Sequence, residues 1–113
     1  MDWDVDYAWF EERIWPVLAE RVAAFEAIKV INAWVGHYDY NGLDQNAVLG
    51  RHPVIGNFYF ANGFSGHGLQ QGPGAGNAIA ELIVHGDYRT TDLGRLGYER
   101  IMRSEPLFER NVI

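Results

Sequence analysis

The chain has 113 residues, enough for one small domain with a hydrophobic core, and its 48% hydrophobic and 21% charged residues are an ordinary globular composition. The net charge of −6 disfavours nucleic acids and anionic membranes as partners, because their phosphates attract Lys and Arg. The lack of cysteine excludes disulfides, cysteine metal sites and a thiol nucleophile, and no apolar run reaches the roughly 20 residues of a transmembrane segment.

Residues 5–27 are predicted to form an N-terminal helix. Apolar residues recur there at helical spacing and are separated by charged ones. Pro16 interrupts this pattern, and since a proline inside a helix removes a hydrogen bond, we expect a bend or two short helices. With Trp3, Trp9 and Trp15 this is most simply a packing helix, and the alternative is that its aromatic residues cover a surface that a missing N-terminal part would bury.

Short strands are predicted to follow this helix. β-Branched residues favour a strand over residues 28–38, and Asn41-Gly42 predicts a turn within residues 39–47. Two more strands are expected at residues 47–49 and 57–61. Such short strands need neighbours, so we expect exposed strand edges and apolar patches in the isolated chain.

The most unusual segment is residues 62–76, NGFSGHGLQQGPGAG, which holds six of the 13 glycines. Glycine lets the backbone approach a ligand closely, and a helix predicted over residues 74–84 would offer unpaired N–H groups at its start. A strand, a Gly-rich loop and a helix in succession therefore favour binding of a phosphate or another electron-rich group. A plain strand-to-helix turn is the alternative interpretation.

The dinucleotide-binding fingerprint G-x-G-x-x-G matches poorly. The glycines give G-x-x-G-x-G at residues 63–68 and G-x-G-x-G at residues 72–76, and no acidic residue ends a second strand at the usual distance. A P-loop is excluded because Gly-Lys-Ser/Thr does not occur. The histidines lack metal-ligand spacing, so no metal site is predicted.

The last third of the chain is predicted to be helical and then extended. Helix 74–84 should end at Gly86, and Asp92 is placed to cap a short helix over residues 93–102. The buried face of helix 74–84 is expected to contain Ala75, Ala78, Ile79, Leu82 and Ile83. The expected fold is therefore α/β, an α+β fragment with an N-terminal helix, short strands, a Gly-rich loop and a helix.

The run Asn62-Gly63-Phe64-Ser65-Gly66-His67-Gly68 resembles the C-terminal motif of the D-amino-acid oxidase/sarcosine oxidase superfamily. The resemblance covers about residues 10–113 of the chain. Supporting residues are His52-Pro53, Asn57, the run from Trp34 to Asn41, Asp44-Gln45-Asn46, Leu69-Gln70-Gln71, Pro73, Glu81-Leu82, Asp92-Leu93 and the closing run from Glu109 to Ile113.

This resemblance implies a single C-terminal fragment, residues 1–113, of a larger FAD-dependent oxidoreductase fold. Family members bind FAD through an N-terminal Rossmann fingerprint, which is absent here. FAD binding would then need the missing N-terminal part or subunit, and the fragment is not expected to be active alone. The implied reaction is oxidation of a C–N bond in a small amine or amino acid by hydride transfer to flavin.

The resemblance also implies which residues form the site. The loop and helix would face the pyrimidine end of the flavin, where backbone N–H groups stabilise the negative charge that builds near N1 and O2. Cofactor contacts are expected from Gly63, Phe64, Ser65, Gly66, His67, Gly68, Leu69 and Gln70. The expected catalytic positions are Tyr38, His67 and Gln70, with a core tyrosine and a structural histidine as alternatives for the first two.

The sequence departs from monomeric sarcosine oxidase-like enzymes at two positions. Those enzymes carry a lysine that pairs with the substrate carboxylate where this chain has the uncharged Gln70. Their flavin-tethering cysteine matches roughly Gly36, so FAD is expected to be noncovalent.

A second function stays open, because one subgroup of the superfamily is associated with assembly of respiratory complex I. The chain could then belong to a non-catalytic assembly factor or interaction module. A bacterial protein of this kind is expected in the cytoplasm, and a eukaryotic one on the matrix side of the mitochondrion.

Overall fold

The computed structural model describes residues 3–110, which fold as two compact units, residues 3–37 and residues 38–110. The first unit is helical. Its elements are the helices α1 (Tyr7–Trp9), η1 (Phe10–Ile14), α2 (Trp15–Arg21) and η2 (Ala23–Ala27).

A bend or two short helices is expected around Pro16, and the helical segment is divided there into α1, η1 and α2. Pro16 lies in the first turn of α2, and the preceding element η1 is a π-helical turn, a wider turn that adapts the helix to an interruption of its hydrogen bonds. Val22 is extended (φ −138°, ψ 101°) and ends the helix. The indole N–H of Trp15 donates to the carbonyl oxygen of Phe25 at 2.7 Å, which holds η2 against α2.

The strand predicted over residues 28–38 is wrong, because this segment contains no regular element. β-Branched residues favour strand conformation, but a strand also needs a hydrogen-bonding neighbour, and the described part of the chain supplies none to this segment. Ile31 is 92% exposed and Trp34 is exposed as well. The expected apolar patches are thus confirmed in the first unit.

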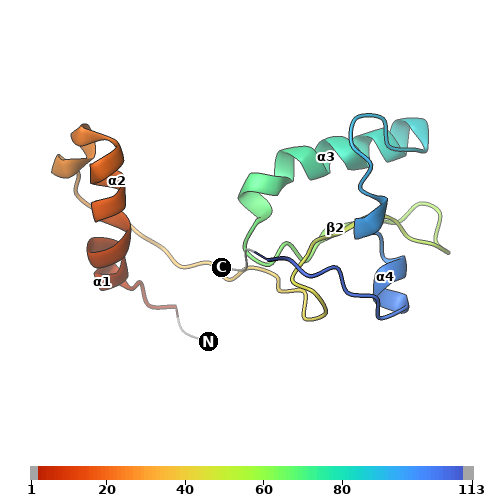
Figure 1. Ribbon diagram of the computed structural model, residues 1–113, viewed down its shortest axis with the longest axis horizontal. Coiled ribbons are helices and arrows are strands. Elements are labelled where there is room, and N and C mark those ends of the chain that lie inside the picture. The colour runs from red at the N-terminus through yellow and green to blue at the C-terminus, as the bar shows by residue number, and fades with distance from the viewer. Residues whose placement is uncertain (1–2, 111–113) are drawn as a thin grey trace. The chain divides into compact units, whose positions relative to one another are not determined.

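The second unit is built on a hairpin. Strands β1 (Val48–Arg51) and β2 (Tyr59–Asn62) pair antiparallel, with Val48 opposite Asn62 and Arg51 opposite Tyr59. Both expected strands are confirmed, each shifted by one or two residues. Helix α3 (Gly68–His85) lies along one side of the hairpin (Figure 1). Its small residues Ala75 and Ala78 are buried, which brings helix and strands close together.

The core of this unit is small. Its buried centre consists of Ala47, Leu49 and Ala75, and the half-buried residues packed around it are Phe64, Leu93 and Leu96. Beside it, the imidazole Nδ1 of His52 accepts hydrogen bonds from the backbone amides of Val54 and Ile55 at 3.1 and 2.9 Å and so fixes the hairpin turn. The ring of His52 stacks on Phe60 and Tyr98, with centroids 5.7 Å apart in both pairs.

Helix α3 begins at Gly68, six residues before the predicted start at Gly74. Glycine and Pro73 argued against a helix there, but packing of the helix against the hairpin outweighs their low propensity. The expected C-cap is confirmed, since Gly86 has φ 82° and donates to the carbonyl oxygen of Leu82 at 3.0 Å. Ala75 and Ala78 are buried as predicted, whereas Ile83 is exposed.

The helix predicted over residues 93–102 is divided in two, η3 (Gly94–Leu96) and α4 (Glu99–Met102). Gly97 separates them with an extended conformation (φ −62°, ψ 158°). The N-cap residue of η3 is Leu93 rather than the expected Asp92, whose carboxylate accepts from the backbone amide of Gly94 at 2.8 Å. Residues 105–110 have no regular secondary structure. Residues 111–113, which belong to the closing run that supports the family resemblance, lie outside the described part. None of the helices in the described part is long and apolar enough to cross a bilayer.

Candidate functional site

The Gly-rich loop connects β2 to α3 and makes a tight reversal. Gly63, Ser65 and Gly66 all have positive φ, at 71°, 50° and 97°. A side-chain carbon on Gly63 would lie 3.3 Å from Cβ of Asn41, so the loop packs closely against residues 39–41. Glycine is therefore required at Gly63 both by the backbone conformation and by the close approach.

Every second amide of the loop is bonded to the protein itself. The backbone amide of Gly63 donates to the carboxylate of Asp39. The amide of Ser65 donates to the carbonyl oxygen of Asp39, and the amide of His67 to that of Phe64, both at 3.0 Å. The amides of the loop therefore do not all point at a ligand, because alternate amides hold the loop's shape.

Consecutive unpaired amides begin one step later, in the first turn of α3. Within the described residues, the backbone amides of Gly68, Leu69 and Gln70 have no hydrogen-bond acceptor. No side chain caps this end of the helix, and its first turn has no acidic residue. Three free N–H groups and the positive end of an 18-residue helix dipole therefore favour an anionic or electron-rich group.

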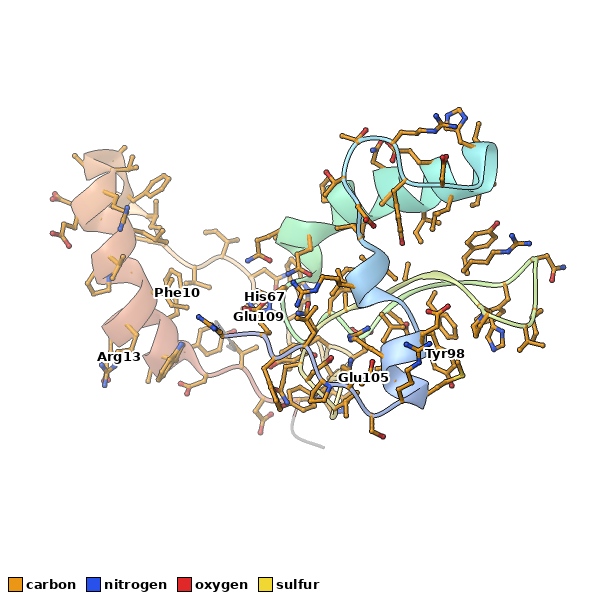
Figure 2. The ribbon with its side chains drawn as sticks, turned by 45° about the vertical axis from the view of Figure 1, so that its right-hand side comes forward. Phe10, Arg13, His67, Tyr98, Glu105 and Glu109 are labelled. Carbon is orange, nitrogen blue, oxygen red and sulfur yellow. The ribbon has the colours of Figure 1, made fainter. Side chains whose placement is uncertain are left out.

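His67 is the N-cap residue of this helix (Figure 2). Its imidazole Nδ1 is buried and has no hydrogen-bond partner among the described residues. A buried polar atom without a partner is costly, and native proteins rarely leave one unsatisfied. The position is suited to a hydrogen bond with a group outside the described residues.

The other predicted site residues differ in what they contact. A side-chain carbon placed on Gly66 would lie 3.5 Å from the ring of Tyr38. Phe64 packs against the core of the unit. Ser65 is fully buried, with its Oγ accepting from the backbone amide of Asn41 at 2.9 Å. Leu69 is 91% exposed.

Gln70 is exposed and lines a groove of about 410 Å³ between α3, β1 and residues 90–96. Its lining combines apolar side chains with neutral amides and hydroxyls. The residues lining it are Asn46, Leu49, Gln70, Gln71, Gly74, Ala75, Asn77, Ala78, Thr90, Thr91, Leu93 and Leu96. With no charged side chain in its lining, the groove favours neutral or apolar groups.

Sequence reasoning missed a buried ion pair behind the loop. Arg100 Nε lies 2.7 Å from Asp44 Oδ2, and both side chains are almost completely buried. Burial raises the pKa of Asp44, but hydrogen bonds from Arg100, Leu107 and Asn46 and the charge of Arg100 outweigh it, so the pKa lies below its ordinary value of 3.8. One signal was available, since Leu93, Leu96 and Arg100 share helical spacing and place the arginine on an apolar face.

Metal chemistry finds no support in this part of the molecule. Across residues 3–110, His, Asp and Glu side chains form no group of three or more that could hold a metal ion. The arrangement instead offers a rigid loop, three free amides and an unpaired imidazole nitrogen. These groups can hydrogen-bond an electron-rich ligand, and none of them supplies redox chemistry.

Curated relatives match almost the whole chain. Proteins called FAD-dependent oxidoreductase domain-containing protein 1 from Xenopus laevis and Bos taurus are 52% and 49% identical to it over 110 residues, 97% of this chain. A homolog from Drosophila melanogaster is 44% identical over 95% of the chain. The chain spans only 22%, 23% and 21% of the length of these relatives.

A solved structure also resembles the chain. The L-proline dehydrogenase from P. horikoshii superposes with a TM-score of 0.65 at 28% sequence identity, covering 93% of this chain and 27% of the dehydrogenase. The family model described as FAD dependent oxidoreductase matches residues 2–82, which include the Gly-rich loop and most of α3. The chain therefore belongs to the FAD-dependent oxidoreductase family known as DAO.

Proposed function

We propose that the start of α3 forms one wall of a noncovalent FAD site, in an oxidoreductase that oxidises a C–N bond of a small amine or amino acid. The observation that carries the proposal is the set of three unpaired amides at Gly68, Leu69 and Gln70. They follow the loop that carries the family resemblance, and the family model spans them.

The residues at this end of the helix fit a flavin ring edge. An electron-rich pyrimidine edge accepts hydrogen bonds, and the first turn of α3 supplies donors without a competing acidic side chain. Bound FAD would supply the hydride acceptor for the reaction. The free amides would stabilise negative charge on the ring, and because the loop fixes them beforehand, they need no reorganisation during the reaction.

His67 and Gln70 have separate proposed roles. The unpartnered Nδ1 of His67 would hydrogen-bond the cofactor or a bound substrate. The side chain of Gln70 would contact the substrate through its neutral amide. A neutral amide can hydrogen-bond a substrate that has a carboxylate and a substrate that has none. Tyr38, whose ring lies against Gly66, would close the side of the loop.

The remainder of the FAD site would come from polypeptide outside this chain. The chain spans about a fifth of the curated relatives' length, 22% for the Xenopus protein. Only one edge of the cofactor would be covered by the first turn of α3. FAD binding is accordingly a property to be tested in the natural protein that contains residues 1–113.

The test uses that protein purified with excess FAD. Visible absorbance should show bound flavin, and anaerobic addition of N-methyl amino acids or other secondary amines should bleach it. Gln70→Glu adds a negative charge at the helix N-terminus, so it should stabilise the apoprotein yet weaken FAD binding about 2- to 5-fold. Ala80→Glu adds the same charge at an exposed position in the middle of α3 and should leave the FAD affinity unchanged.

A folded but colourless protein would refute the flavin site. That outcome would favour the second candidate, a non-catalytic assembly factor or interaction module, for which the exposed apolar side chains of the first unit would be the contact surface. A yellow protein that no amine bleaches would support the FAD site and refute amine oxidation.

A further inference from the structure

The buried ion pair ties a late segment of the chain to residues 39–46. The guanidinium of Arg100 holds both oxygens of Asp44, with Nε at 2.7 Å and Nη2 at 3.1 Å. Its remaining N–H groups donate to the backbone carbonyls of Leu96, Gly97, Asn46 and Ala47 at 2.7–3.2 Å. This one side chain therefore joins η3 and α4 to the segment in front of β1.

From Asp44 the contacts continue to the Gly-rich loop through Asn41. Asp44 Oδ1 accepts from the side-chain amide of Asn41 at 2.9 Å. The backbone amide of Asn41 donates to Ser65 Oγ at 2.9 Å, and its Cβ lies against Gly63. Ser65 Oγ in turn donates to the carbonyl oxygen of Gly63 at 3.2 Å. A series of hydrogen bonds thus runs from Arg100 through Asp44 and Asn41 to Ser65 and Gly63, two loop residues with positive φ.

We infer that Arg100, acting through Asp44 and Asn41, is a positioning residue for the Gly-rich loop and for the free amides of α3 that follow it. The consequence for FAD rests on the proposed function. Arg100 lies beyond residues 2–82, the span of the family match.

The arrangement requires arginine rather than any cation. Arginine presents five N–H donors in a planar fork, and here the fork bonds two carboxylate oxygens and four carbonyls at once. A lysine keeps the charge but has one ammonium group, which cannot reach all six acceptors. Arg100→Lys therefore removes the geometry of the contact while it preserves the charge.

The test compares Arg100→Lys with Arg103→Lys. Arg103 is exposed, follows α4 directly and has only a 4.0 Å contact with Glu105. In the natural protein, Arg100→Lys should speed amide exchange at Gly63 and Ser65 and raise the Kd for FAD, each by about 3- to 30-fold. Exchange at residues 78–85 of α3 should stay as in the wild type, and Arg103→Lys should change none of these quantities.

If Arg100→Lys does not fold, the double variant Asp44→Leu/Arg100→Met takes its place, since apolar residues of similar size often replace a buried ion pair without loss of stability. It also removes the contact with Asn41, so the loop amides should exchange faster. The inference would be overturned if amide exchange at Gly63 and Ser65 did not change, or if amide exchange rose equally throughout α3. Faster exchange in the loop with an unchanged Kd for FAD would overturn it as well. If the wild type binds no FAD while Arg100→Lys still loosens the loop, the proposed function fails and the link from Arg100 to the loop stands.

Discussion

Two ion pairs in this chain have the same length and opposite surroundings, which makes the cost of breaking each one predictable. Arg100–Asp44 and Arg89–Asp87 both have an N–O distance of 2.7 Å. The side chains of the first pair are 6% and 0% exposed, and both of the second are 60% exposed. Asp44→Asn leaves a buried guanidinium without its counter-charge, which costs about 3–5 kcal/mol, whereas Asp87→Asn should cost about 0–1 kcal/mol.

The hydrogen bonds of Asp44 add to this cost. Its carboxylate accepts from Arg100, from the Asn41 side chain and from the backbone amides of Asn46 and Leu107. An asparagine at this position turns one acceptor oxygen into a donor that faces other donors. Because small domains are stable by only about 5–15 kcal/mol, the variant should lose a large fraction of the free energy of unfolding.

Urea denaturation at pH 7, followed by circular dichroism, measures both variants against the wild type. The pKa of Asp44 is lowered in the folded state, so its ionised form contributes stability that is complete above the unfolded value near 3.8 and is lost as the pH falls through the lower folded value. The stability difference between wild type and Asp44→Asn should therefore shrink below pH 3.8. Equal losses for Asp44→Asn and Asp87→Asn at pH 7 would refute the reasoning.

Further predictions concern α3 and the loops beside it. Hydrogen bonds from Thr90, Arg89 and Asn77 lower the pKa of Glu81 to about 2 from its ordinary value of 4.5, so its carboxylate should hold residues 89–90 at neutral pH. The two residues should be released as the pH falls from 4.5 through 2, which NMR titration of the Thr90 amide measures. In Glu81→Gln the Thr90 amide should be insensitive to pH over this range. Gly76→Ala should stabilise the protein by about 1 kcal/mol in thermal unfolding, because the site is helical and open, and destabilisation in the natural protein would mean that this face is covered. Gly66→Ala should destabilise by about 1–2 kcal/mol, since φ is 97° there, and an unchanged melting temperature would contradict the conformation of the loop.

The sequence predicted local features of the fold well where one residue decides them. Pro16 lies at the start of α2, Gly86 ends α3, and the carboxylate of Asp92 binds the first backbone amide of η3. Each of these depends on a property of the residue itself, either a missing N–H, freedom at positive φ or a carboxylate close to an amide. Such properties act without distant neighbours, and a pattern in the sequence is enough to find them.

The predictions failed where tertiary contacts decide. Residues 28–38 have the composition of a strand but no partner within the described residues. The start of α3 at Gly68 depends on packing against the hairpin, and helix propensity does not account for such packing. For the candidate site, the family motif located the segment, but which of its amides are free depends on Asp39, twenty-four residues before Gly63.

The position of Arg100 in the chain has a consequence for biosynthesis. Asp44 leaves the ribosome 56 residues before the side chain that neutralises it. Until α4 has been made, the hairpin and α3 can associate only if that carboxylate stays hydrated or takes up a proton. Completion of this unit is therefore a late event, and a nascent chain arrested between α3 and α4 should be digested by proteases that the finished protein resists.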